Sequence, residues 1–248
     1  MTAGGGPGGT GGRGGAAGGP VHELDRSRLL ERLGIGFADP ALLDEALSHR
    51  SAGGRHYERL EFLGDSLLSF VVSTELCRLR PDDDEGALSR LRASLVREAT
   101  LAEIARELEL GRHLVLGTGE RRSGGFARDS ILADAVESLI GAVHADAGFE
   151  AARALVLRLF ETRFANLPSA ESLKDPKTRL QELLQARGLE RPTYEVVAES
   201  GRAHERRFTV RCTLGATGAS VRATASSRRK AEQAAAERLL ERAEALPR

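Results

Sequence analysis

Two groups of acidic residues lie on segments whose other residues are mostly apolar. Glu58, Glu61 and Asp65 are spaced i, i+3 and i+7, which places them on one face of a helix. Asp134 and Glu137 are spaced i and i+3 and share a face in the same way. Acidic pairs of this kind often mark a solvated helix face. Here the apolar neighbours favour burial, and a buried carboxylate is costly unless it is paired or binds a metal.

Taken together, the two groups indicate a metal site. No Arg or Lys lies between Arg128 and Arg153 to neutralise the second group, so two such helices would repel one another if they packed together. A divalent cation removes this repulsion, and ligation by oxygen alone favours Mg²⁺ or Mn²⁺ over zinc. The histidines are scattered and complete no nucleophile–base pattern. The glycine-rich stretches complete no phosphate-binding loop.

The segments that carry these carboxylates read as helices. Residues 21–165 show helical periodicity almost throughout and no convincing strand. Ser27 is predicted to cap the first helix, and Asp39 followed by Pro40 to begin the second. The predicted helices cover residues 28–33, a segment from residue 40, and residues 56–79, 86–96, 98–109, 128–147 and 149–164. The first acidic group thus falls on one long helix and the second group on another.

The pattern changes beyond residue 165. Residues 166–175 are rich in turn formers and read as a linker. They precede a predicted α-β-β-β-α module over residues 176–187, 193–199, 206–214, 219–225 and 227–243. We expect its sheet to carry both helices on one face. Residues 1–20 are mostly glycine and are predicted to be a disordered tail.

The formal net charge of zero conceals an asymmetry between the two parts of the chain. Residues 1–173 contain 20 basic and 26 acidic side chains, whereas residues 174–248 contain 16 basic and 10 acidic ones. The net charges are therefore −6 and +6. A basic module of this kind indicates a polyanionic partner. Arg228, Arg229 and Lys230 lie together at the predicted start of the last helix, where backbone N–H groups also favour phosphate.

Length and composition exclude several classes of protein. The chain has 248 residues, of which 41% are hydrophobic and 29% charged, as expected of globular domains. Its apolar runs are too short to cross a bilayer, and we expect no secretory signal and no membrane partner. Cys77 and Cys212 are 135 residues apart, which favours neither a disulfide framework nor a thiolate zinc site. We therefore expect a cytoplasmic protein without an organic cofactor.

Residues 58–66, which read ERLEFLGDS, closely resemble the signature of the bacterial ribonuclease III family. The resemblance continues through ALSHRS at 46–51, DEGALSRLRA at 84–93 and LADAVESLIG at 132–141, and it spans about residues 24–243. Residues 226–236 resemble the last helix of a double-stranded RNA-binding domain. Two residues depart from the family pattern. Tyr57 stands where the family usually has Asn, and Glu232 where many such domains carry Lys.

This resemblance implies a role for each acidic residue. The implied metal cluster consists of four carboxylates: Glu61, Asp65, Asp134 and Glu137. Asp65 and Glu137 would be the catalytic members. Glu58 and Glu85 match accessory acidic positions that shape the cleft and the RNA path. The implied RNA-binding residues lie on the first helix, the first hairpin loop and the last helix of the basic module: Thr178, Gln181, Glu182, Gln185, His204, Arg228, Arg229 and Lys230.

The expected architecture is an all-α endonuclease domain over 21–165, followed by a small α+β double-stranded RNA-binding domain over 176–244. The resemblance implies a homodimer that uses Mg²⁺, or Mn²⁺ in its place, to cut double-stranded RNA. Its products would carry 5′-phosphate and 3′-hydroxyl ends, and its substrates would be ribosomal RNA precursors and structured messenger RNA. The main alternative is a non-catalytic double-stranded RNA-binding regulator, which would need a degenerate acidic cluster. A more distant alternative is a metal phosphohydrolase acting on small molecules, against which the basic module argues.

Overall fold

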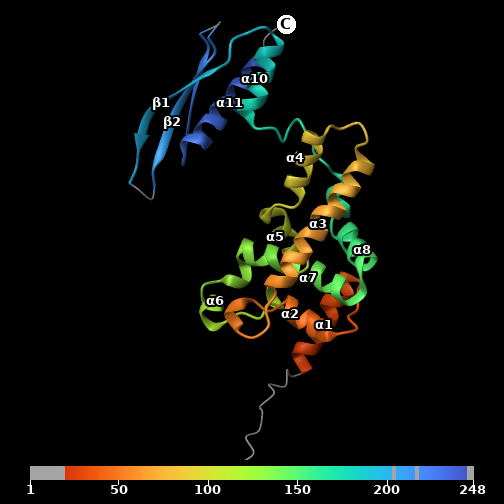
Figure 1. Ribbon diagram of the computed structural model, residues 1–248. Coiled ribbons are helices and arrows are strands. Elements are labelled where there is room, and N and C mark those ends of the chain that lie inside the picture. The colour runs from red at the N-terminus through yellow and green to blue at the C-terminus, as the bar shows by residue number, and fades with distance from the viewer. Residues whose placement is uncertain (1–19, 203–204, 216–217, 245–248) are drawn as a thin grey trace, which may run out of the picture. The chain divides into compact units, whose positions relative to one another are not determined.

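The computed structural model describes residues 20–202, 205–215 and 218–244 (Figure 1). Its α-helices are α1 (Pro20–Leu33), α2 (Pro40–Ala46), α3 (Glu58–Leu79), α4 (Glu85–Leu95), α5 (Glu98–Glu107), α6 (Thr118–Arg122), α7 (Asp129–Ala147), α8 (Phe149–Leu159), α9 (Glu161–Ala165), α10 (Pro176–Ala186) and α11 (Arg228–Glu244). Its strands are β1 (Thr193–Ser200), β2 (Arg207–Thr213) and β3 (Ser220–Ala225). Three 3₁₀ turns are also present: η1 (Arg50–Ala52), η2 (Leu110–Arg112) and η3 (Gly125–Ala127). Of the predicted tail over residues 1–20, only Pro20 lies within the described residues.

Contacts divide the chain into two compact units. One unit contains the described residues up to Thr74 together with Leu95–Thr162. The other contains Glu75–Ser94 together with the described residues from Arg163 onward. Helix α3 contributes to both units, with the first acidic group in the first of them.

Helix α7 forms the centre of the first unit and packs against α2, α5 and α8. Its apolar residues are buried on nearly every side from Ile131 to Val143. Asp134 and Glu137 interrupt this surface and are only partly buried. Removing this much apolar area from water is the main stabilising term for a helical domain. Both carboxylates are therefore fixed on a helix whose position the core determines.

Most of the predicted helices are confirmed within a few residues, and α3 ends at Leu79 as expected. The side chain of Asp39 caps α2 by accepting a hydrogen bond from the backbone N–H of Ala41. The predicted cap at Ser27 is wrong, because α1 already begins at Pro20 and Ser27 lies inside it. Proline is favoured at the first position of a helix, and the residues between include good helix formers. The structure also contains the short helix α6 over Thr118–Arg122, which the sequence pattern does not predict.

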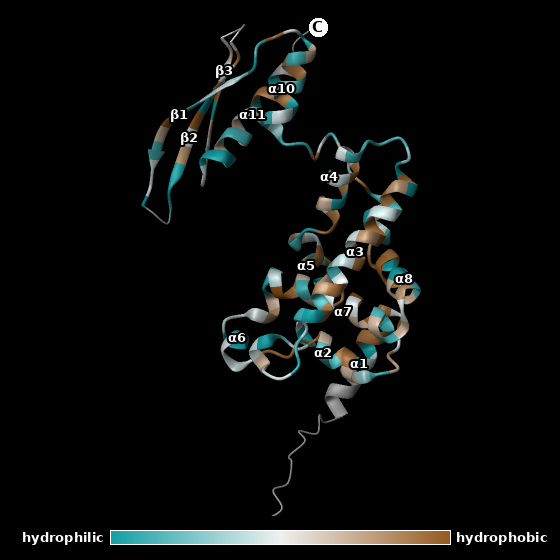
Figure 2. Ribbon diagram, in the orientation of Figure 1, coloured by the Kyte–Doolittle hydropathy of each residue, from teal (hydrophilic) through white to brown (hydrophobic). Residues whose placement is uncertain are grey.

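The second unit contains the predicted α-β-β-β-α module, which confirms the expected fold class. Its sheet is antiparallel with the order β1-β2-β3, and Val210 pairs with Val196 on one side and Ala223 on the other. Helix α11 packs on β2 and β3, and α10 packs on α11, so both helices cover one face of the sheet (Figure 1). Figure 2 shows hydrophobic residues interspersed with hydrophilic ones along α10 and α11. Leu180 and Leu184 of α10 lie in the resulting core.

Candidate metal centre

Helices α3 and α7 cross with their backbones in close contact, at Gly64 of α3 and Gly141 of α7. A Cβ atom on Gly64 would lie 1.8 Å from the carbonyl oxygen of Glu137, and one on Gly141 would lie 2.1 Å from that of Leu60. Real Cβ atoms do not approach backbone so closely, so only glycine fits at these two positions. This crossing brings the acidic group of α3 against the acidic group of α7. The glycines were not recognised from the sequence, although a glycine inside an apolar helix is a signal of close packing.

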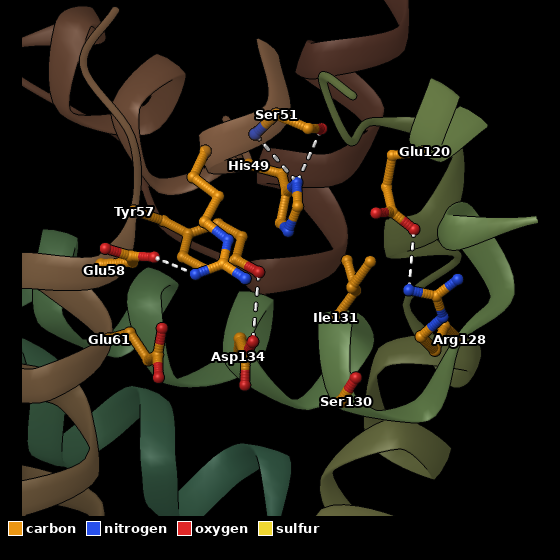
Figure 3. A pocket seen from close by; sticks show the side chains of 11 residues that line it. His49, Ser51, Tyr57, Glu58, Glu61, Glu120, Arg128, Ser130, Ile131 and Asp134 are labelled. Carbon is orange, nitrogen blue, oxygen red and sulfur yellow. Dashed lines mark hydrogen bonds and ion pairs between the residues drawn. The ribbon is translucent and has the colours of Figure 1, made fainter. Parts of the chain in front are cut away.

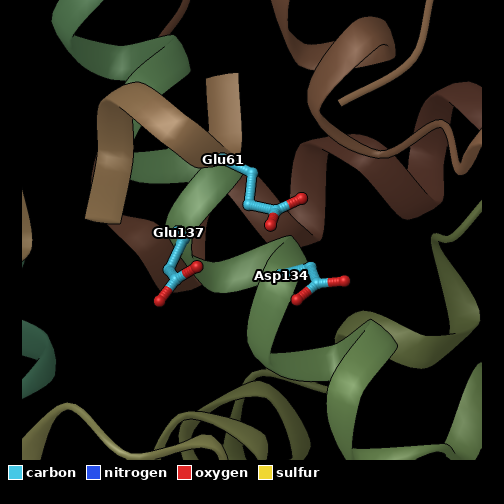
Figure 4. Close-up of side chains that lie close together, drawn as sticks. All are labelled: Glu61, Asp134 and Glu137. Carbon is cyan, nitrogen blue, oxygen red and sulfur yellow. The ribbon is translucent and has the colours of Figure 1, made fainter. Parts of the chain in front are cut away.

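Three of the four predicted cluster members come together at this crossing: Glu61, Asp134 and Glu137. One carboxylate oxygen from each lies within 4.8 Å of the others. Figure 4 shows the three side chains, one from α3 and two from α7, pointing toward a common space. All three are partly buried. The spacing of the oxygens and their hard-donor chemistry fit a divalent cation such as Mg²⁺ or Mn²⁺.

The electrostatics of the cluster disfavour its charged forms. Burial raises the pKa of Glu137 to about 8, and the negative charges of Asp65, Asp134 and Glu61 add to this effect. Burial also raises the pKa of Glu61 to about 7, with Asp134 as the next cause. The pKa of Asp134 is raised by burial too, although its hydrogen bond with Tyr57 opposes the change. Glu137 and Glu61 therefore retain protons near neutral pH that a bound cation would displace.

The remaining acidic positions lie outside this group of three. Asp65 is exposed one turn after Glu61, yet after burial its charge is the largest cause of the raised pKa of Glu137. Glu58 begins α3 and forms an exposed ion pair with Arg50 at 3.5 Å. Glu85 begins α4 in the second unit and accepts a hydrogen bond from the hydroxyl of Ser89 at 2.8 Å. The structure thus brings together three of the six acidic candidates.

A cavity of about 590 Å³ opens beside the cluster, and Glu61 and Asp134 form part of its wall (Figure 3). Two cations that the sequence did not suggest also line it. Arg50 comes from η1, and Arg128, which precedes α7, forms an ion pair with Glu120 at 2.8 Å. The cavity therefore combines acidic groups with positive charges that could contact a phosphate.

In the basic module, the structure places the predicted RNA-binding residues mostly at the surface. Thr178, Glu182 and Gln185 of α10 are exposed, and Gln181 is partly buried. The three cations at the start of α11, Arg228, Arg229 and Lys230, are also exposed. His204 lies outside the described residues. The described part of this surface therefore combines polar groups of α10 with positive charge of α11.

Glu232 ties the two helices of the basic module together. Its carboxylate accepts hydrogen bonds from Nζ of Lys177 at 2.7 Å and from Nε of Arg228 at 2.8 Å. Burial acts to raise the pKa of Glu232, but the hydrogen bonds and charges of these two partners outweigh it and lower the pKa. Glu232 is therefore an ionised link between α10 and α11.

A helical domain with a partly buried acidic cluster, followed by a basic α-β-β-β-α domain, defines a nuclease joined to a nucleic-acid-binding module. Residues 39–163 match the model of ribonuclease-III-like domains, and residues 176–242 match that of the double-stranded RNA binding motif. The chain therefore belongs to the ribonuclease III family and is an endoribonuclease.

Several known proteins are similar over most of the chain. Ribonuclease 3 of Methylococcus capsulatus is 55% identical over 86% of this chain and 93% of its own length. Ribonuclease 3 of Vibrio cholerae is 53% identical over 87% of this chain and 96% of its own length. A solved nuclease domain of ribonuclease III from Campylobacter jejuni, which has a region involved in dimer formation, is 44% identical with a TM-score of 0.55. That match covers 56% of this chain and 98% of the solved domain.

Proposed function

We propose that this endoribonuclease hydrolyses phosphodiester bonds of double-stranded RNA in a Mg²⁺-dependent reaction that leaves 5′-phosphate and 3′-hydroxyl ends. The observation that carries the proposal is the convergence of Glu61, Asp134 and Glu137 within 4.8 Å on a chain that also has a double-stranded RNA binding motif. Mn²⁺ is the expected substitute, because it accepts the same oxygen ligands.

Within this proposal the acidic residues have distinct roles. Glu61, Asp134 and Glu137 would hold the cation, with Asp65 as a fourth acidic group beside them. When bound, the cation supplies an activated water and relieves charge on the phosphate. Asp65 and Glu137 are the proposed catalytic members. Partial burial of the cluster strengthens its electrostatic interactions relative to those in water.

We propose that residues 176–244 anchor the RNA, joined by residues 166–175 to the nuclease domain over 21–165. Exposed Arg228, Arg229 and Lys230 would contact phosphates. The polar face of α10 would contact one minor groove, and His204 the next one. Duplex RNA is recognised mainly by its shape and its 2′-hydroxyl groups, so little sequence specificity is expected. Glu58 and Glu85 are the proposed accessory acidic residues along the RNA path.

A homodimer is the proposed assembly. On α3, the side chains of Phe62 and Phe70 are 78% and 59% exposed, and their spacing of eight residues places them on similar faces. Exposed phenylalanines on the helix that carries the acidic cluster support a contact between two copies. Two copies would place two acidic clusters in one assembly, as cutting both strands of a duplex requires.

The proposed substrates are ribosomal RNA precursors and structured messenger RNA, and the proposed location is the cytoplasm. The similarity to bacterial proteins named Ribonuclease 3 supports the proposed substrates. The free thiols of Cys77 and Cys212 agree with the proposed cytoplasmic location, because disulfides are rare in the reducing cytoplasm. Among the described residues, no helix is both long and apolar enough to cross a membrane.

A long RNA duplex incubated with the purified protein tests the proposal. We expect short duplex products in Mg²⁺ and intact RNA in the presence of a chelator, with 5′-phosphate ends on the products. Binding of the duplex without cleavage in Mg²⁺ would instead indicate a non-catalytic regulator.

A further inference from the structure

Tyr57 directly precedes α3 and lies against the acidic cluster. Its side chain is only 2% exposed. Its hydroxyl donates a hydrogen bond to Oδ2 of Asp134 across a distance of 3.1 Å. Figure 3 shows this bond joining the segment before α3 to α7 at the wall of the cavity. Tyr57 is also one of the two positions, with Glu232, at which this chain departs from the family pattern that its sequence resembles.

The backbone of Tyr57 is fixed on both sides. Its N–H donates to the carbonyl oxygen of Ser48 at 2.9 Å, and its carbonyl oxygen accepts from the N–H of Glu61 at 2.8 Å. Its ring packs edge-on against His49, with 5.7 Å between the ring centroids. Tyr57 thus contacts Glu61 of α3 through its main chain and Asp134 of α7 through its side chain.

The hydroxyl can only act as a donor to Asp134 in this setting. An ionised carboxylate has no hydrogen to donate, so the tyrosine hydroxyl supplies the hydrogen in the 3.1 Å contact with Asp134. A donor to one carboxylate oxygen favours the ionised carboxylate and fixes its orientation. The other oxygen is then left for a cation. Groups that orient metal ligands in this way commonly set metal affinity.

We propose that Tyr57 is a positioning residue for the metal centre: its hydroxyl orients Asp134 so that the carboxylate binds the divalent cation. This inference rests on the proposed function, since it presumes that the cluster binds a cation. The competing explanation is that Tyr57 only fills the core with its ring. Phenylalanine fills the same space without the hydroxyl, so the two explanations predict different behaviour for Tyr57→Phe.

The test measures Mn²⁺ binding to the full-length protein without RNA, by titration calorimetry, together with thermal unfolding in chelator. Tyr57→Phe should raise the Kd for Mn²⁺ roughly tenfold, while the metal-free melting temperature stays close to that of the wild type. Tyr194→Phe is the matched control, because Tyr194 is the other tyrosine of the chain and lies on β1 of the basic module. Its Kd should equal that of the wild type.

An unchanged Kd in Tyr57→Phe would overturn the inference. If Tyr57→Phe also unfolds at a lower temperature, its effect is measured again in an Asp134→Asn background. A role through Asp134 predicts no further loss of Mn²⁺ affinity there, whereas an equal loss in both backgrounds would assign the effect to packing. Glu137→Gln tests the proposed metal centre separately from the proposed role of Tyr57. If it binds Mn²⁺ as well as the wild type does, the proposed metal centre itself is wrong.

Discussion

At the scale of single residues, Glu137 has the most informative environment. Burial and three neighbouring carboxylates raise its pKa from 4.5 to about 8, so it keeps a proton at neutral pH when no cation is bound. Glu61 behaves in the same way with a pKa of about 7. The fold therefore holds together acidic groups whose charged forms are unfavourable when no cation is bound. This cost is the physical reason to expect tight coupling between metal binding and pH.

The raised pKa values predict how the metal-free protein responds to pH. Between pH 4.5 and about 8 the folded state holds protons that the unfolded state has released. The free energy of unfolding should therefore fall as the pH rises through this window. Urea unfolding in chelator at several pH values measures the slope. Glu137→Gln should make the slope shallower, and an identical slope in both proteins would contradict the assigned environment.

The acidic residues could be predicted from the sequence because helical spacing alone places them on shared faces. The hydrogen bond between Tyr57 and Asp134 could not, since it joins residues 77 positions apart and depends on how two helices meet. The same holds for Arg50 and Arg128, which approach the cluster only in the folded chain.

At the scale of elements, the crossing of α3 and α7 determines whether the cluster exists. Periodicity predicted both helices, because apolar residues recur through them. It could not predict that they touch at Gly64 and Gly141, because the pattern within one helix does not indicate which other helix packs against it. The short helix α6 was missed because five residues carry too little periodicity.

Gly141→Ala should disrupt the centre. Its methyl group would lie 2.1 Å from the carbonyl oxygen of Leu60, so the two helices must move apart. We expect a loss of about 1–3 kcal/mol of stability and a large loss of cleavage, measured by chemical unfolding and by RNA cutting. Gly119→Ala on α6 is the control, because nothing lies within 4 Å of its added methyl group. Equal cleavage activity of the two variants would show that cleavage does not require the close contact between α3 and α7.

At the scale of the whole molecule, the two parts of the chain carry opposite net charges, which supports a division between an RNA anchor and a nuclease. The last 75 residues carry a net charge of +6, from 16 basic and 10 acidic side chains, and the rest carries −6. Phosphate contacts by cations release counterions, so binding that depends on several of them weakens steeply with salt. The proposed RNA anchor should therefore determine the salt range in which the enzyme works.

Arg228→Ala combined with Arg229→Ala tests this division. The double variant should bind a duplex more weakly, show a shallower salt slope, and still cut at low salt or high enzyme concentration. Arg211→Ala combined with Arg222→Ala removes the same charge from the two paired strands β2 and β3 and should change the slope less. If both double variants respond to salt identically, the start of α11 is not the anchor.

The proposed homodimer makes a separate prediction. Wild-type protein should sediment as a dimer at micromolar concentration, and Phe62→Asp should sediment as a folded monomer. The phenylalanine is 78% exposed within one chain, so its replacement costs a single copy little stability. Circular dichroism checks that the helices remain. A wild-type monomer that cuts both strands would contradict the proposed assembly.

The most direct test of the central claim separates cutting from binding in Glu137→Gln. In Mg²⁺ we expect cleavage of a duplex by this variant to fall by about a thousandfold or more, because the centre loses charge stabilisation of several kcal/mol. Duplex binding, measured in parallel, should stay close to that of the wild type. Glu150→Gln, which neutralises an exposed glutamate of α8, should change neither. Cleavage by Glu137→Gln at the wild-type rate, with the same Mg²⁺ dependence, would show that Glu137 takes no part in a metal centre for cleavage.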